Sequence, residues 1–321
     1  MSDWITRFKL VWIIALACIY VTVLYHRFDS LKKPVIAPTL PRTKILFVFL
    51  SIGNKPERVQ LIHDNLQVLG STPFIGRYQV DCLIFSYASY TNEPGWLHAM
   101  EKSSQPRCQI IRLYKTGYVA FLKSLIPSLI KDAGYTYLTI SLDDVAISPP
   151  YSTFNLVGFY DKVQEYNLSI ASCAIQGTPH SGLRPTPMPS RNHIGRLVSM
   201  IEFQSITFSM AAWECIYELV DTEYPSGWGP DIWFDRYCLH GDKVKNTRLG
   251  VIETMKIVHN PYGLETTNLA GQNPHDIMVA QEKAWLKERG IKLLRTPAVT
   301  IGYLVSEQYQ QDPSDLNVDV F

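Results

Sequence analysis

Two adjacent carboxylates are the first candidate ligand-binding group in this sequence. Asp143 and Asp144 follow directly after an apolar run at 135–142. Neighbouring carboxylates repel each other unless a cation or hydrogen-bond donors offset their charge, and their oxygens suit hard ions such as Mg²⁺ or Mn²⁺. The pair therefore indicates a candidate metal site, and the alternative is an ordinary solvated turn.

The second candidate group lies in residues 227–259. Trp228 is flanked by Gly227 and Gly229, and glycine allows the backbone to come close to whatever the indole covers. Pro230 suits the first turn of a helix, which Gly241 would end. This segment therefore predicts a close-approach loop that leads into a helix.

Two polar side chains accompany that loop. Asp231 would lie in the first turn of the helix, and His259 ends the second of two short apolar runs. Together with the tryptophan loop they predict a ligand site. For Asp231 alone the alternative is a carboxylate that stabilises its own helix N-terminus by about 0.3–1 kcal/mol.

The elements that must position these residues alternate between strand and helix. Apolar, β-branched runs predict strands, and apolar residues at helical spacing predict helices. The alternation favours an α/β fold, a mostly parallel mixed sheet with helices on both faces, in which ligands bind beyond the carboxyl ends of the strands. Asp143 and Asp144 would lie at such an end. The predicted strands are 44–50, 79–85, 108–113, 135–142, 168–174 and 249–252, and the predicted helices are 58–69, 118–130, 209–220, 230–240 and 280–289.

Composition excludes some classes of function. The 321 residues are 46% hydrophobic and 18% charged, which is an ordinary globular composition. The formal net charge is +1, so nucleic-acid binding has no electrostatic basis here. The six cysteines form no Cys-x-x-Cys pair, which argues against a structural zinc site.

The N-terminal region predicts a membrane anchor. Residues 10–25 carry no charge and as a helix would span about 24 Å, which suits a thin bilayer. Trp12 and Tyr25 lie near its ends, where aromatic rings prefer the membrane interface. No small-residue cleavage site follows, so a retained transmembrane anchor at 10–26, after a short tail at 1–9, is favoured over a cleaved signal peptide. The flanking charges leave the orientation open.

The rest of the chain divides into three parts. Residues 27–42 contain Pro34, Pro38 and Pro41 and predict an extended stem. We expect one domain at 43–307 and a loose tail at 308–321. Asn167-Leu168-Ser169 is a glycosylation sequon, which fits a domain on the lumenal side.

Residues 205–259 resemble domain-of-unknown-function family 707, which looks like a glycosyltransferase of the A-type nucleotide-sugar fold. A looser resemblance extends back to about residue 44. The matching segments are Phe-Ser-Met-Ala-Ala-Trp-Glu-Cys at 208–215, Gly-Trp-Gly-Pro-Asp at 227–231, Tyr-Cys-Leu-His-Gly-Asp at 237–242, Lys-Asn at 245–246, Gly-Val-Ile-Glu at 250–253 and Ile-Val-His at 257–259.

The resemblance implies a divalent cation, Mn²⁺ or Mg²⁺, that bridges the donor's diphosphate. A-type transferases hold it with an Asp-x-Asp-like motif at a strand end and often with a later histidine. Asp143 and Asp144 fall at the acidic cluster, and His259 is the natural counterpart of the histidine. Leu142 stands where the family's first aspartate would be expected. The metal ligands that the resemblance implies are therefore Asp143, Asp144 and His259.

The resemblance also implies the reaction and its setting. A sugar would pass from a nucleotide-sugar donor to a glycan acceptor, with Asp231 as the base. Trp228 and Gly229 would contact the donor, and Lys123 would approach its diphosphate unless it is simply solvated. Cys215 and Cys238 would pair in a lumenal domain anchored in the Golgi or endoplasmic reticulum membrane. The alternative is a non-catalytic lumenal protein that keeps the fold and binds glycans or a partner.

Overall fold

The computed structural model describes residues 42–52, 55–70, 73–86, 95–102, 108–113, 118–177, 192–220, 238, 248–262, 280, 283–284, 287–288 and 300–306. The predicted anchor, the stem up to residue 41 and the tail at 308–321 lie outside these residues, as does the predicted helix 230–240 apart from Cys238. Within the described residues, no helix is both long enough and apolar enough to cross a membrane.

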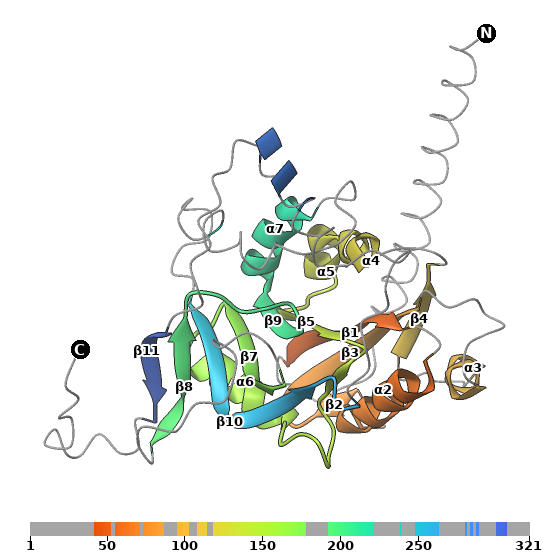
Figure 1. Cartoon of the computed structure of the whole chain (residues 1–321), viewed down its shortest axis with the longest axis horizontal. Coiled ribbons are helices and arrows are strands. Elements are labelled where there is room, and N and C mark those ends of the chain that lie inside the picture. The colour runs from red at the N-terminus through yellow and green to blue at the C-terminus, as the bar shows by residue number, and fades with distance from the viewer. Residues whose placement is uncertain are drawn as a thin grey trace, which may run out of the picture.

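Among the described residues, one mixed sheet of eleven strands forms the centre of the molecule (Figure 1). Its order is β11-β8-β10-β7-β9-β5-β1-β3-β2, with β4 beside β3 and β6 beside β10. The pairings give β1, β3, β4, β5, β7, β10 and β11 one common direction. The predicted mostly parallel mixed sheet is therefore confirmed. The strands are β1 (Thr43–Ile52), β2 (Phe74–Ile75), β3 (Tyr78–Ser86), β4 (Cys108–Arg112), β5 (Tyr137–Leu142), β6 (Val145–Ala146), β7 (Ile170–Gln176), β8 (His193–Val198), β9 (Ser205–Ser209), β10 (Leu249–His259) and β11 (Thr300–Val305).

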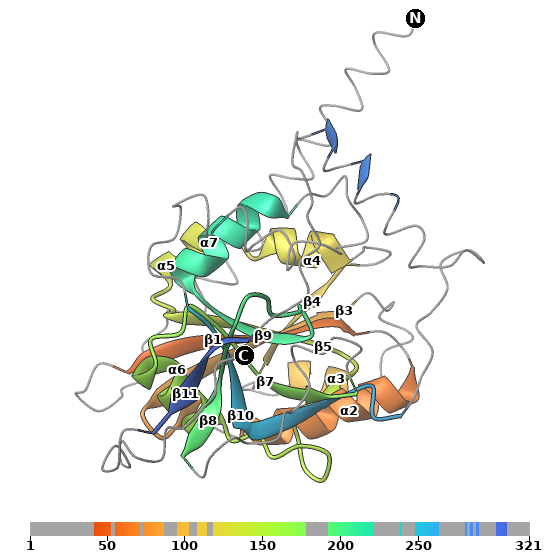
Figure 2. The same ribbon diagram turned by 60° about the vertical axis from the view of Figure 1, so that its left-hand side comes forward.

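Helices cover both faces of this sheet. In Figures 1 and 2, α4, α5 and α7 lie on one face, and α2, α3 and α6 lie on the other. The central strands are accordingly apolar along their length, and residues 45–50 of β1 are all buried. The helices are α2 (Pro56–Val68), α3 (Gly95–Lys102), α4 (Tyr118–Ser124), α5 (Pro127–Asp132), α6 (Leu156–Glu165) and α7 (Met210–Leu219).

Two predicted elements require correction. The single helix expected at 118–130 is two helices, because Ile126, which precedes Pro127, is extended and ends the first one. The two apolar runs that end at Ile252 and His259 form one strand, β10, whose pairing with β7 shifts register between Ile252 and Lys256. The residues between the two runs form this irregularity.

Two disulfides hold helices and strands of the described chain together. Cys215 on α7 pairs with Cys238 across a Cα–Cα distance of 5.9 Å, which confirms the predicted bridge. Cys82 and Cys108 lie opposite each other on β3 and β4 and form a bridge that the sequence did not indicate. Cys173 is a buried free thiol.

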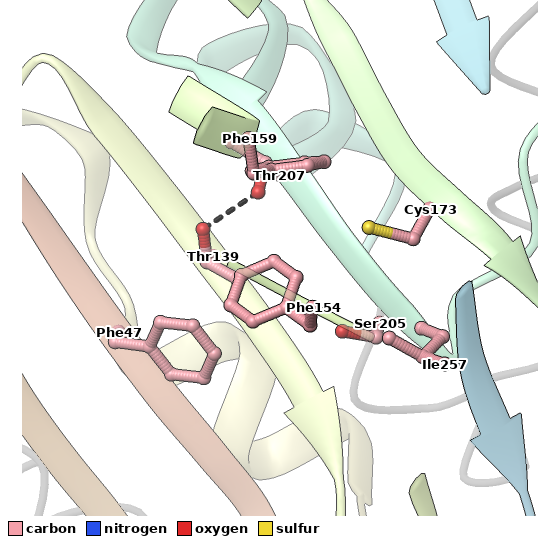
Figure 3. Close-up of a pocket in the computed structure, with 8 residues that line it drawn as sticks. All are labelled: Phe47, Thr139, Phe154, Phe159, Cys173, Ser205, Thr207 and Ile257. Carbon is pink, nitrogen blue, oxygen red and sulfur yellow. Dashed lines mark hydrogen bonds between the residues drawn. The ribbon is translucent and has the colours of Figure 1, made fainter. Parts of the chain in front are cut away.

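A water-sized cavity lies within the core (Figure 3). Its walls combine three phenylalanine rings with hydroxyl, thiol and aliphatic side chains, and Thr139 and Thr207 share a hydrogen bond of 2.7 Å across neighbouring strands. It is too small for a nucleotide or a sugar, so the candidate site lies elsewhere. The lining residues are Phe47, Thr139, Phe154, Phe159, Cys173, Ser205, Thr207 and Ile257.

Candidate functional site

The acidic pair lies where the central strand β5 ends. β5 runs between β1 and β9, and Asp143 and Asp144 form the turn from β5 into the short strand β6. Asp143 is only 3% exposed, and the side chain of Asp144 is 18% exposed. The pair is therefore not a solvated turn, and two carboxylates this buried need compensating partners.

The end of β10 brings His259 to this pair. β6 pairs antiparallel with β10, so His259 lies opposite Val145, and the Asn260 N–H donates to the Asp144 carbonyl at 2.6 Å. The Nε2 atom of His259 lies 3.6 Å from Oδ2 of Asp144. Two of the side chains selected from the sequence, more than a hundred positions apart, are thus neighbours.

Arg58 is a third member of the site, and the sequence patterns did not single it out. It projects from the first turn of α2, the helix that follows β1. Its Nη1 donates to Oδ1 of Asp143 at 2.9 Å, and its Nη2 lies 3.5 Å from Oδ2 of Asp144. The Arg58 side chain is 15% exposed, so this ion pair is largely shielded from water. Arg58 therefore bridges the two carboxylates.

Asn65, which lies further along α2, fixes the loop that follows the acidic pair. Its Nδ2 donates to the Val145 carbonyl at 2.7 Å. Its Oδ1 accepts from the Ile147 N–H at 2.9 Å and from the Ser148 hydroxyl at 3.2 Å. Asn65 is fully buried, so this helix holds the backbone of the site as well as its charges.

Gly177, just after β7, allows two backbone segments to approach at the site. Its φ is +88°, in the left-handed region that glycine favours. A Cβ atom there would lie 2.7 Å from the His259 carbonyl oxygen, which is closer than real Cβ atoms come. A larger residue would therefore push the end of β10, and His259 with it, away from Asp144.

The surroundings shift the pKa values of the two carboxyl groups in opposite directions. Burial, reinforced by the charge of Asp144, raises the pKa of Asp143 to about 7 against the opposing effect of Arg58. Burial acts on Asp144 in the same direction, but the interactions with His259 and Arg58 outweigh it and lower the pKa of that carboxyl. Asp144 is therefore the member of the pair that keeps its negative charge to lower pH.

The pKa of the His259 ring is raised, whereas that of its partner Asp144 is lowered. Burial lowers its pKa, but Asp144, Glu202 and a hydrogen bond with the Gly177 backbone together raise the pKa above its ordinary value. Without a metal, the protonated ring therefore stays paired with Asp144 over a wider pH range. A metal ion at this position would have to displace that proton.

Asp143, Asp144 and His259 could supply some, but not all, of the ligands of a divalent cation. Oδ2 of Asp143 and Oδ1 of Asp144 are buried and have no hydrogen-bond partner among the residues that the structure describes. Those residues contain no group of three or more His, Cys, Asp or Glu side chains that could hold a metal alone. Cations such as Mg²⁺ are commonly held by one or two carboxylates and by substrate phosphates. Asp144 and His259 are therefore suited to contribute to a divalent-cation site, in which other groups would have to supply the remaining ligands.

A second buried charge cluster joins β8 to β10. Oε2 of Glu253 lies 2.6 Å from Nε2 of His193, and Oε1 of Glu253 lies 3.1 Å from Nε of Arg196. All three side chains are at most 5% exposed. Opposite charges compensate each other here, so the cluster has a structural explanation.

Lys123, the one remaining candidate residue that the structure describes, contacts a different part of the chain from the acidic pair. The ammonium of Lys123 lies 2.9 Å from the Val220 carbonyl oxygen and 4.3 Å from the centre of the Tyr217 ring. These contacts direct Lys123 to the C-terminal end of α7. Asp231, Trp228 and Gly229 lie outside the described residues, so their roles stay predictions.

A family model and several solved structures resemble this chain. Residues 190–295 match the family described as "Protein of unknown function (DUF707)". None of the curated protein sequences matches. The structure of GalNAc-T7 with UDP, GalNAc and Mn²⁺ superposes with a TM-score of 0.51 at 10% identity, over 81% of this chain and 53% of that one.

Two other structures superpose less closely. The mannosyltransferase PcManGT from Pyrobaculum calidifontis, in complex with GDP-Man and Mn²⁺, gives a TM-score of 0.46 at 14% identity, over 88% of this chain and 76% of that one. S. aureus TarS gives 0.45 at 11% identity, over 76% of this chain. This chain spans 40% of TarS and about half of GalNAc-T7. The superposition shows that this chain has a mixed α/β fold like that of GalNAc-T7.

Proposed function

We propose that this chain, a third of which matches a family of unknown function, is a glycosyltransferase that moves a sugar from a nucleotide-sugar donor to an acceptor hydroxyl. The observation that carries the proposal is the buried Asp143–Asp144 pair at the carboxyl end of β5 with His259 beside it. This edge of an α/β sheet is where ligands bind. Buried carboxylates with unpartnered oxygens are suited to hold a cation and sugar hydroxyls rather than to pack.

Each member of the site has a distinct role in donor binding. Asp144 and His259 would hold a divalent cation, Mn²⁺ or Mg²⁺, which when bound neutralises charge on a leaving diphosphate. Asp143 is held by Arg58 through one oxygen, and its other oxygen is free to accept a hydrogen bond from a donor hydroxyl. Arg58 keeps two adjacent carboxylates close together before the donor arrives.

The reaction needs a base on the acceptor side. The acceptor oxygen bonds to the anomeric carbon while the bond from that carbon to the diphosphate breaks, and the acceptor proton passes to a carboxylate. Asp231 is the candidate for that carboxylate, with Trp228 packed on a sugar face and Gly229 beside the donor. These three residues belong to the segment that matches the family.

We place this activity on the lumenal side of the Golgi or endoplasmic reticulum membrane, with residues 10–26 as the anchor. The two disulfides support an oxidising compartment, because cytosolic proteins rarely keep such bonds. The acceptor would be a glycan or glycoconjugate.

Calorimetry with the purified chain tests the donor site. We expect UDP or GDP to bind only with Mn²⁺ or Mg²⁺, and Asp144→Ala to abolish that binding. Glu165→Ala is the matched control, because the Glu165 side chain on α6 is 42% exposed and pairs with Lys162, and it should bind like the parent. If Asp144→Ala binds the nucleotide as well as the parent, the metal assignment is wrong.

Turnover tests the reaction itself. A screen of nucleotide sugars for Mn²⁺-dependent hydrolysis identifies the donor, and Asp231→Asn should lower turnover more than donor binding. Metal-dependent nucleotide binding without any hydrolysis or transfer would favour the non-catalytic alternative, in which the fold binds ligands only.

A further inference from the structure

Asn167 occupies an exposed turn between α6 and β7. Its φ is +47°, a left-handed conformation that asparagine tolerates better than most residues. The next residue, Leu168, is 3% exposed and anchors the turn in the core. Ser169 is held on both sides, because its N–H donates to the Arg248 carbonyl at 2.9 Å and its carbonyl accepts from the Ser209 N–H at 2.8 Å. The asparagine side chain is therefore presented to solvent on a fixed backbone.

Exposed apolar side chains on the outermost strand of the described sheet lie beside this turn. β11 is the outermost strand in the described sheet order, and its Tyr303 and Val305 are 56% and 42% exposed. The hydroxyl of Tyr166, the residue before Asn167, donates to the Val305 carbonyl at 2.8 Å. Figure 2 shows α6 and β11 on the same side of the molecule. Exposed edge strands pair readily with other chains, and proteins usually cover or charge them.

We propose that Asn167 carries an N-linked glycan, and that the glycan covers the exposed Tyr303 and Val305 side chains of β11. Asn167-Leu168-Ser169 has the required acceptor pattern. The Asn167 Nδ2 atom bonds to the anomeric carbon of a lipid-diphosphate-linked oligosaccharide, the bond from that carbon to the phosphate oxygen breaks, and the amide loses one proton. The lipid diphosphate is the leaving group.

The inference rests on the lumenal location given under the proposed function and does not rest on transferase activity. The disulfides Cys82–Cys108 and Cys215–Cys238 support the location independently of the sequon. A chain that binds no nucleotide could still carry the glycan. A chain that carries no glycan could still bind nucleotides.

Expression of the full chain in eukaryotic cells, followed by peptide N-glycosidase digestion, tests the site. Ser169→Thr keeps the hydroxyl that the sequon requires, and Ser169→Ala removes it. Both variants change the same residue, so they form a matched pair. We expect the parent and Ser169→Thr to lose the mass of one glycan on digestion, and Ser169→Ala and Asn167→Gln to migrate unchanged. An unchanged parent overturns the proposal.

A reporter sequon appended after Phe321 separates the two ways in which the proposal could fail. A modified reporter with an unmodified Asn167 would overturn the site and leave the lumenal location standing. If neither is modified, the lumenal location is wrong as well. Nucleotide binding by the same preparations is measured separately and reports on the transferase proposal alone.

The covering role is tested by aggregation of the purified variants. We expect light scattering on warming to rise earlier for Ser169→Ala than for Ser169→Thr, and addition of Tyr303→Lys to delay it in the Ser169→Ala chain, because a charge blocks edge pairing. Equal aggregation of the two Ser169 variants would show that the glycan does not cover this edge.

Discussion

Replacing Arg58 with methionine tests how the acidic pair is held. The Arg58→Met variant would keep much of the packed stem of the side chain but leave Asp143 and Asp144 without the guanidinium that now bridges them at 2.9 and 3.5 Å. The three side chains are 15%, 4% and 18% exposed, so water would compensate for the loss only partly. Removing one partner of a buried ion pair costs about 3–5 kcal/mol, and we expect a loss in that range at pH 8.

The loss should depend on pH in a defined direction. Burial raises the pKa of Asp143 to about 7, above the roughly 3.9 of an unfolded aspartate. The folded chain therefore binds more protons between these values, and the contribution of Asp143 to stability falls as pH rises through that window. Because Arg58 opposes this shift, its removal should raise the Asp143 pKa further. The penalty of Arg58→Met should be smaller at pH 5, where Asp143 takes up a proton.

Urea unfolding followed by tryptophan fluorescence, with a chelator present, measures the free energy of unfolding of the parent and of Arg58→Met at pH 5 and pH 8. Trp213 is fully buried and should report on loss of the core. Arg77→Met is the control, because Arg77 is paired with Asp161 at the surface, and its effect should be small at either pH. A loss below about 1 kcal/mol, as for an exposed pair, or an equal loss at pH 5 and pH 8, would refute the reasoning.

Three further changes test the elements around the site. Asn65→Ala removes the partner of buried backbone groups and should cost about 1–3 kcal/mol for each group left unpaired, measured by urea unfolding, with weaker nucleotide binding. Gly177→Ala should displace the backbone at His259 and weaken Mn²⁺-dependent nucleotide binding in calorimetry, and unchanged affinity would show that the close approach is unimportant. Replacing Cys82 and Cys108 together with serine should cost about 2–5 kcal/mol, and the loss should match what reduction of that bridge alone produces in the parent.

The sequence alone identified several of the buried strands and the strand ends at which chemistry could occur. Apolar runs identified β1, β3, β4, β5 and β7, because a strand buried on both faces must be apolar along its length. The same runs identified where β5 stops and the acidic pair begins. His259 was selected because it ends a strand and because of the family resemblance, and that resemblance also supplied the Cys215–Cys238 pairing. These features depend on residues close in the chain or on a specific motif.

The tertiary structure decided which of these ends meet. Arg58 and Asp143 are 85 positions apart, and Asn65 reaches a loop at least 80 positions away, so no local pattern could indicate either contact. Antiparallel β9 enters the sheet between β5 and β7, which sets the position of β7 and of its neighbour β10. β6 then pairs with the end of β10 and places His259 beside Asp144. Local periodicity fixes how a segment folds, but sheet order and packing fix its neighbours, because those depend on contacts that the whole chain must satisfy together.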